Sequence, residues 1–258
     1  MPSRLGAHAD RIGEVRDLLT VRGRREQQRF AFEGATLLDE ALRSGVAIES
    51  IYATEASYEA SPAIVALERD GTQIYLVDDR TAAKISDLQT PTGIVAVAPI
   101  VLARAQDLFE APGLVLILAD LNDPGNAGTL LRSAEAFGAT TAVFGRFGVD
   151  PHHPKVVRGS MGATFRLRLC VAEAPEVSAA ARARGALLWG LDASGEPLQH
   201  QRFPERAGLV VGHERRGLGA WGDVCDRRLA IQMRGSGESL NAAVAGSIAL
   251  YAASLATE

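Results

Sequence analysis

The stretch that decides the fold is residues 114–132, LVLILADLNDPGNAGTLLR, in which an apolar run passes directly into a polar, turn-forming segment. Residues 114–119 have the near-continuous apolarity of a strand that is covered on both faces of a sheet. Asp123, Pro124, Gly125 and Asn126 form a turn signal. A helix is expected over residues 128–137. The stretch therefore predicts a strand, a turn and a helix of an α/β domain.

Similar short apolar runs continue to the end of the chain and predict a parallel sheet. The expected strands are 141–144, 167–171, 187–191, 209–211 and 229–233. Helices are expected between several of them, notably over 176–184, and a last, largely apolar helix over 239–255. Ser239 is the expected N-cap of that last helix, because its hydroxyl can accept from the first backbone N–H groups. Residues 114–258 are thus predicted to form one α/β domain.

The first part of the chain, residues 1–99, predicts a basic N-terminal arm followed by a second, smaller α/β domain. Residues 33–44 predict an amphipathic helix that ends at Gly45. The other expected elements are strands at 48–53, 74–77 and 93–99 and a helix at 60–70. Residues 100–113, which contain a Pro-Gly pair, are expected to be the linker.

Composition limits the compartment and the class of protein. The 258 residues are 47% hydrophobic and 22% charged, which is typical of a globular protein. Two cysteines, far apart, suit neither a disulfide framework nor a metal site, and no secretory segment or membrane-spanning run is apparent. The sequence therefore predicts a cytoplasmic protein with no metal and no membrane partner.

Positive charge is concentrated in two segments although the net charge is −4. Residues 20–30 hold four arginines against one glutamate, and residues 146–168 hold five basic residues against one aspartate. A single basic run is equally well explained as a solvated face, so each alone decides nothing. Together they are candidates for binding phosphates, and the candidate RNA-binding residues are Arg22, Arg24, Arg25, Lys155, Arg158 and Arg166.

Three segments combine polar residues with glycines at predicted strand ends. The first is 120–132, with Asn126 and Arg132; the second is GHERRGL at 212–218, with Glu214; the third is IQMRGSGESLN at 231–241, with Ser239 and Asn241. Each alone is explained as a polar turn, a charged loop or a helix cap. No GxGxxG follows the expected strand at 114–119 and GxxxxGK[ST] occurs nowhere, so a Rossmann site at this strand and a P-loop site are excluded.

Together the three segments resemble the motifs of the SpoU/TrmH family in the SPOUT class of RNA 2′-O-ribose methyltransferases. The resemblance spans most of residues 114–255 in the right order, and KVVRGSMGATFR at 155–166 is similar to the family's segment between the first two motifs. The first domain resembles, more weakly, the family's N-terminal substrate-binding module, which is similar to an RNA-binding ribosomal protein.

The resemblance implies a deep trefoil knot, S-adenosyl-L-methionine as methyl donor, and a homodimer. It also implies the site residues. The catalytic set is Asn126, Arg132, Glu214, Ser239 and Asn241, and the donor-binding set is Gly212, Ile231, Met233, Gly237 and Leu240. Gln232 departs from the family pattern, which usually has proline after the isoleucine. An arginine normally stays protonated, so Arg132 is assigned to binding phosphate and orienting the ribose, and the proton acceptor stays open.

The expected activity is methylation of a ribose 2′-hydroxyl in RNA. The N-terminal module favours large-subunit ribosomal RNA. Two alternatives remain: a tRNA 2′-O-methyltransferase, and a non-catalytic RNA-binding or ribosome-assembly protein with the same fold.

Overall fold

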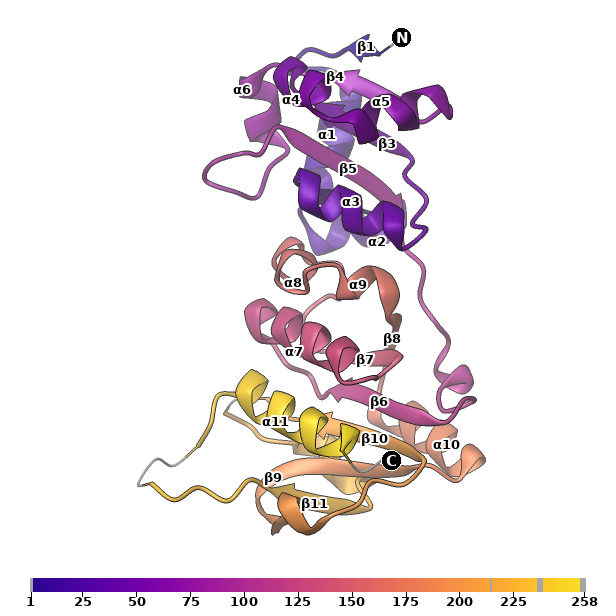
Figure 1. The fold of residues 1–258 in the computed structure, drawn as a ribbon, viewed down its shortest axis with the longest axis vertical. Helices are drawn as coiled ribbons and strands as arrows, with labels where there is room; N and C mark the ends of the chain where they lie inside the picture. Colours follow the sequence, from indigo (N-terminus) through magenta and orange to yellow (C-terminus); the bar gives the residue numbers. More distant parts are fainter. Residues whose placement is uncertain (1, 214, 236–238, 256–258) are drawn as a thin grey trace. The chain divides into compact units, whose positions relative to one another are not determined.

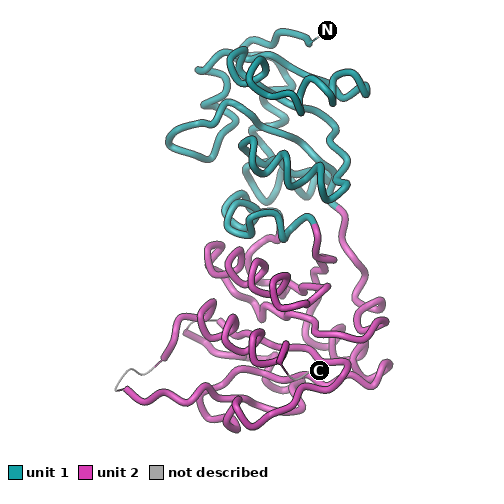
Figure 2. The backbone as a smooth tube through the Cα atoms, in the orientation of Figure 1, with its two compact units in different colours: residues 1–100, 152–165 teal, residues 101–151, 166–258 magenta. Residues whose placement is uncertain are grey.

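The computed structural model describes residues 2–213, 215–235 and 239–255. The chain folds into two compact units (Figure 2). Unit 1 comprises residues 1–100 and 152–165, and unit 2 comprises residues 101–151 and 166–258. Among the described residues, no helix is long and apolar enough to cross a membrane.

Unit 1 is built on a mixed five-stranded sheet with the strand order β1-β4-β3-β5-β2 (Figure 1). Strands β1, β3 and β4 are parallel, and β5 is antiparallel to both of its neighbours. The strands are β1 (Ser3–Arg4), β2 (Arg29–Glu33), β3 (Ser50–Ala53), β4 (Gln73–Leu76) and β5 (Ile94–Pro99). The helices are α1 (Asp10–Asp17), α2 (Val21–Gln27), α3 (Ala35–Arg43), α4 (Glu55–Ala60), α5 (Pro62–Arg69) and α6 (Asp79–Lys84).

Residues 152–165 join the core of unit 1, although the sequence places them inside the second domain. They lie in and around α8 (Pro154–Gly159) and α9 (Ala163–Arg166). Val157 is fully buried in the apolar cluster that includes Phe30 and Phe32 of β2. The ring of Phe165 lies 5.1 Å from that of Phe32, and the ring of His152 lies 4.5 Å from that of Phe30. These contacts, remote in sequence, assign the segment to unit 1.

Unit 2 contains a six-stranded sheet, all parallel, in the order β11-β9-β10-β6-β7-β8. The strands are β6 (Gly113–Leu118), β7 (Thr141–Gly145), β8 (Arg168–Ala172), β9 (Leu187–Pro197), β10 (Arg206–Val211) and β11 (Arg227–Ala230). The predicted α/β class with a parallel sheet is confirmed. The chain leaves β6 toward β7 on one side, while β10 pairs with β6 on the other, so the strand order reverses at β6. Crevices outside the carboxyl ends of strands at such a point are where open α/β sheets bind ligands.

The helices of unit 2 are α7 (Pro124–Ala136), α10 (Ala174–Arg184) and α11 (Ala242–Ser254), with 3-10 turns η1 (Ala105–Asp107), η2 (Leu198–His200) and η3 (Gly219–Val224). Helices α7 and α11 lie side by side in Figure 1. Between them, the Oγ atoms of Ser133 and Ser247 are 2.7 Å apart and the rings of Phe137 and Tyr251 are 5.4 Å apart. The helices that follow β6 and β11 are therefore fixed to each other along their length.

Three sequence-based expectations about secondary structure are corrected by the structure. The predicted basic arm is not an arm, because residues 10–27 form α1 and α2 and their apolar side chains Ile12 and Val15 are buried in unit 1. The predicted last strand and last helix are also displaced. Strand β11 ends at Ala230 rather than at residue 233, and α11 begins at Ala242 rather than at residue 239. Residues 231–235 and 239–241 consequently lie in connecting segments.

Candidate active site

The turn after β6 carries the first motif and is held in place by its own side chains. Asp123 caps α7, since its Oδ1 accepts from Asn126 N at 2.7 Å, and Pro124 occupies the first turn, where no backbone donor is needed. Thr129 Oγ1 donates to the carbonyl of Gly125. Asn126 is therefore positioned at the very start of α7, at the carboxyl edge of the sheet.

The third motif meets the first through a direct hydrogen bond. Asn241 is the N-cap of α11, and its Oδ1 accepts from the backbone N of Ala243 at 2.9 Å and of Val244 at 3.2 Å. Its Nδ2 donates to Oδ1 of Asn126 at 3.0 Å. The expectation that Ser239 caps this helix is wrong. Both residue types cap well, and Asn241 is the one whose amide can also reach Asn126.

The second motif follows β10 as a tight hairpin. His213 and Gly217 exchange two backbone hydrogen bonds of 2.9 Å. A Cβ added at Gly212 would lie 2.5 Å from the backbone C and O of Gly217, so the glycine is required by the hairpin itself. The Nε2 of His213 lies 3.3 Å from the Asn122 amide of the first motif. Glu214 falls outside the described residues.

A cavity of about 150 Å³ collects most of the predicted donor-binding residues. Its lining includes Ile231, Met233 and Leu240, together with Ser239 of the predicted catalytic set. Gly212 is not part of this lining, and Gly237 falls outside the described residues. Four of the predicted site residues are thus brought to one hollow.

Another part of the cavity lining comes from the middle of β9 and was not predicted. It consists of Leu191, Asp192 and Ala193. The backbone N of Ser194 donates to Asp192 Oδ1 at 2.9 Å and the Ser194 hydroxyl donates to the same oxygen at 2.7 Å. These bonds lower the pKa of the Asp192 carboxyl and keep it ionised at neutral pH. Nη1 of Arg228 lies 3.5 Å from the other carboxylate oxygen of Asp192, so the cavity combines apolar walls with a carboxylate that is already in an ion pair.

Gln232, the departure from the family pattern, is held by a side-chain contact. Its Oε1 accepts from Nε2 of Gln199 at 2.7 Å, which ties the segment after β11 to η2. A hydrogen bond thus constrains this position where a proline ring would otherwise do so.

Arg132 is exposed on α7 and makes no hydrogen bond or ion pair with another described residue. Its guanidinium is therefore available to a bound anion.

The candidate RNA-binding residues of α2 fall into different environments. Arg25 is exposed, and Arg22 donates to Glu26 at 2.7 Å on the helix surface. Arg24 is fully buried, with Nη1 donating to the carbonyl of Leu18 at 2.8 Å. Its assignment to RNA is corrected, because a guanidinium inside unit 1 cannot reach a phosphate.

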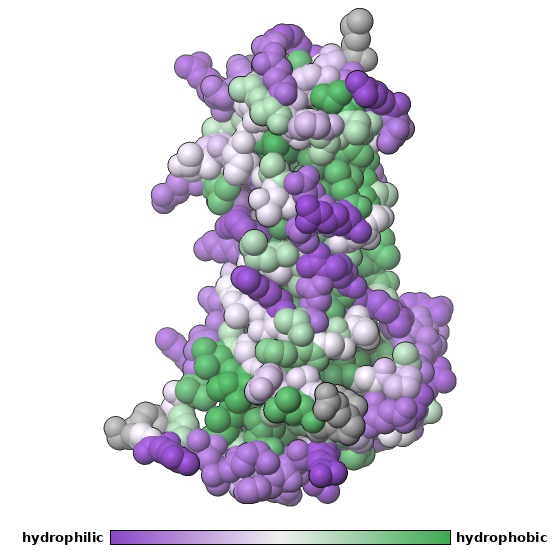
Figure 3. All heavy atoms as spheres, viewed as in Figure 1, coloured by the Kyte–Doolittle hydropathy of each residue, from purple (hydrophilic) through white to green (hydrophobic). Residues whose placement is uncertain are grey.

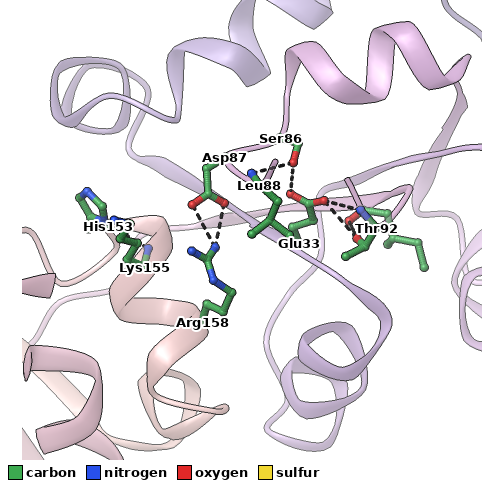
Figure 4. Close-up of polar contacts among 9 residues, drawn as sticks. Glu33, Ser86, Asp87, Leu88, Thr92, His153, Lys155 and Arg158 are labelled. Atoms are coloured by element: carbon green, nitrogen blue, oxygen red, sulfur yellow. Dashed lines mark hydrogen bonds and ion pairs between the residues drawn. The ribbon is translucent and has the colours of Figure 1, made fainter. Parts of the chain in front are cut away.

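Two of the three candidates between β7 and β8 are engaged in ion pairs, and Figure 4 shows the pair made by Arg158. Nη1 of Arg158 lies 2.9 Å from both carboxylate oxygens of Asp87, whereas Lys155 is exposed. Arg166 pairs with Glu135 of α7, with Nη2 2.9 Å from Oε2. Lys155 is thus the candidate of this group whose charge is not offset by a described acid.

The loop that presents Asp87 is fixed by Glu33 at the end of β2 (Figure 4). Glu33 accepts from the backbone N of Thr92 at 2.7 Å and from the hydroxyl of Ser86 at 2.6 Å. No sequence signal marked Glu33 or Asp87, because their partners lie more than fifty residues away.

A parallel sheet whose strand-end loops bring a polar cluster next to a half-apolar cavity defines an α/β enzyme domain with its ligand site at the carboxyl edge. Residues 113–251 match the model of the SpoU rRNA methylase family, and residues 9–96 match that of the MRM3-like substrate-binding domain. The chain belongs to the SpoU rRNA methylase family.

Similar proteins cover nearly the whole chain. The 23S rRNA (guanosine(2553)-2′-O)-methyltransferase RlmP of Bacillus subtilis is 28% identical over 95% of this chain and 96% of its own length. An uncharacterized tRNA/rRNA methyltransferase of Mycobacterium avium is 31% identical over 82% of this chain and 72% of its length. The crystal structure of the SpoU methyltransferase AviRb from Streptomyces viridochromogenes with AdoMet has a TM-score of 0.84 and 27% identity, covering 96% of this chain and 98% of that one.

Proposed function

We propose that this protein transfers a methyl group from S-adenosyl-L-methionine to a ribose 2′-hydroxyl of large-subunit ribosomal RNA. The observation that carries the proposal is the Asn241–Asn126 hydrogen bond, which joins the first and third motifs beside a cavity lined by four of the expected site residues. Membership of the SpoU family and the similarity to RlmP support the same activity.

The chemistry of the cavity lining suits part of the methyl donor, which supplies an electrophilic methyl group on a sulfonium. Leu191, Ile231 and Leu240 provide apolar surface for a flat heterocycle, and Asp192, which also pairs with Arg228, provides a carboxylate that can accept hydrogen bonds. Gly212, Met233 and Gly237 complete the proposed donor-binding set.

The proposed catalytic residues bind and orient the acceptor. Arg132 holds an RNA phosphate and so aligns the ribose for in-line attack on the methyl carbon. Asn126 and Asn241 fix the loop edges, and Glu214 and Ser239 complete the proposed set. The acceptor of the 2′-hydroxyl proton stays unassigned.

We propose that RNA binding and catalysis are carried by different domains. Residues 1–99 bind the RNA substrate, 100–113 link the domains and 114–258 carry catalysis. Arg25 and Lys155 are exposed on unit 1 and are the basic residues best placed to bind phosphates there.

We further propose that the protein is a homodimer, on the basis of an exposed apolar face of α11. Val244, Ile248, Tyr251 and Leu255 recur at helical spacing and all are exposed. A cavity of about 500 Å³ lies beside Ile248 and Tyr251, against η2. Figure 3 shows apolar side chains gathered where α11 lies in Figure 1. The trefoil knot and the cytoplasmic location also remain proposals from family membership.

The activity is tested by incubating the purified protein with labelled S-adenosylmethionine and 23S rRNA, 16S rRNA or bulk tRNA, followed by mapping of 2′-O-methyl groups. We expect the labelled methyl group in one nucleotide of 23S rRNA. Label in tRNA alone would show that the substrate is tRNA rather than ribosomal RNA. No label in any RNA would favour a non-catalytic RNA-binding protein. Sedimentation equilibrium tests the proposed dimer. We expect the wild type to be a dimer and Ile248→Glu to be a monomer. A monomeric wild type would contradict the proposal.

A further inference from the structure

The loop between β7 and α8 is fastened to the first motif by hydrogen bonds that its backbone N–H groups donate. The backbone N of Phe147 donates to Asp120 Oδ1 at 3.2 Å, and the backbone N of Val149 donates to the Leu121 carbonyl at 2.8 Å. The loop closes on itself through a 3.0 Å bond from Gly148 N to the Gly145 carbonyl. Its position is therefore set by the residues that lead into the catalytic turn.

Two glycines allow this close approach. A Cβ at Gly145 would lie 2.6 Å from Asp120 N, and one at Gly148 would lie 2.8 Å from the Leu121 carbonyl oxygen. Asp120 itself has a left-handed backbone, with φ of 51°. That conformation is costly for a residue other than glycine and needs support from its surroundings.

Asp120 receives that support from η3. Nε1 of the buried Trp221 donates to Asp120 Oδ2 at 3.0 Å, so the two carboxylate oxygens hold two different segments. The backbone of Phe147 is thus ordered by contacts to a residue that is itself anchored in the core of unit 2.

The side chain of Phe147, by contrast, is left in solvent. It is 72% exposed, and its ring contacts no other aromatic ring among the described residues. The neighbouring Arg146 is turned to Glu173 and Glu176, with ion pairs of 2.8 and 3.1 Å. Phe147 therefore presents a solitary, exposed aromatic ring on an ordered backbone at the carboxyl edge of the sheet, one strand away from the catalytic turn.

We propose that Phe147 is a stacking platform for an unpaired RNA base close to the target ribose. The inference rests on the proposed function and names a residue that recognises its substrate. A single ring between Arg146 and Gly148 offers too small an apolar surface for a protein interface, whereas one base needs only one ring face. Prior ordering of the loop lowers the entropy lost when the base stacks.

The direct test uses Phe147→Trp as a fluorescent reporter. Trp189 and Trp221 are both 3% exposed and provide a constant background, measured in the wild type under the same conditions. We expect oligoadenylate to quench the new tryptophan, and an abasic ribose-phosphate oligomer of equal length and charge to leave it unchanged. Equal quenching by both oligomers, or by neither, would overturn the stacking platform, and this readout requires no methyl transfer.

A kinetic test compares Phe147→Ala with Phe147→Tyr and Phe147→Leu. Removal of the ring should raise KM for 23S rRNA about tenfold, with kcat and affinity for S-adenosylmethionine unchanged. Tyrosine should restore KM and leucine should not, because leucine keeps the apolar bulk without the flat ring. An unchanged KM for Phe147→Ala in an active enzyme would reject the stacking platform but not the proposed function. An inactive wild type would reject the proposed function itself.

Discussion

Asn241 performs two tasks with one amide: its oxygen caps α11 and its nitrogen donates to Asn126 at the start of α7, 3.0 Å away. Each helix begins directly after a loop that carries one of the three motifs. The bond therefore fixes the distance between two motifs that are 115 residues apart. Loss of the cap and loss of the bond can be separated by choosing the substitution.

Asn241→Ser should keep the cap but lose the bond to Asn126, because the serine side chain is too short to reach it. We expect Tm near that of the wild type and methyl transfer reduced about tenfold, the value of one hydrogen bond. Asn241→Ala, the control, should lose the cap as well and cost about 1 kcal/mol of stability. Wild-type activity in Asn241→Ser, measured by label incorporation, would show that the bond does not matter for catalysis.

Arg132→Ala should abolish methyl transfer while leaving donor binding nearly intact, because Arg132 is exposed on α7 and is absent from the lining of the cavity. Calorimetry with S-adenosylmethionine and a single-turnover assay measure the two effects. Arg132→Lys should recover part of the rate, since it keeps the charge but loses the planar pair of donors. An equal loss of donor affinity and of rate would refute this separation.

Local patterns predicted the sheet of unit 2 well because its strands are buried on both faces and therefore read as continuous apolar runs. They failed where a distant contact decides the outcome. Ser239 and Asn241 are both good caps, and the choice depends on Asn126. Arg24 reads as a surface charge, yet its partner is the Leu18 carbonyl inside unit 1.

The candidate site shows the same limit. The third motif predicted Ile231, Ser239 and Leu240 as site residues. The cavity is also lined by residues from the middle of β9, where no motif lies. The sequence did not predict a structural role for Asp120, because its two hydrogen-bond partners, Phe147 and Trp221, are 27 and 101 residues away. Periodicity reports which face of an element is buried, and it carries no information on which loops meet.

Gly212→Ala should distort the second motif, since its Cβ would lie 2.5 Å from the Gly217 backbone, which cannot move without breaking the hairpin. We expect a loss of about 1–3 kcal/mol in unfolding free energy and a fall in activity. Gly235→Ala is the matched control, because nothing lies within 4 Å of its added Cβ. Urea titration of both variants checks the difference, and equal stabilities would contradict the steric explanation.

Cys225 should react slowly with iodoacetamide in the folded protein. Burial raises the pKa of its thiol to about 11, and its Sγ donates to the Trp221 carbonyl at 3.2 Å. At pH 8 the thiolate fraction should be about 100-fold lower than in the unfolded chain. Because the folded state resists loss of this proton, the thiol should also make stability fall as pH rises through the unfolded pKa near 9. Alkylation in buffer and in urea, followed by mass spectrometry, measures the ratio, and equal rates would contradict it.

The double variant Arg25→Ala, Lys155→Ala should weaken RNA binding and flatten its dependence on salt. Both side chains are exposed on unit 1 and neither has a described acidic partner, so each is free to displace counterions from a phosphate. Each lost contact should reduce the slope of log K against log salt by about 0.7 for single-stranded RNA. Arg22→Ala is the control on the same helix, because Arg22 already pairs with Glu26 at 2.7 Å and should change the slope less. Filter binding of 23S rRNA across a KCl series measures all three slopes. A slope in the double variant equal to that of the wild type would place the RNA on a different surface.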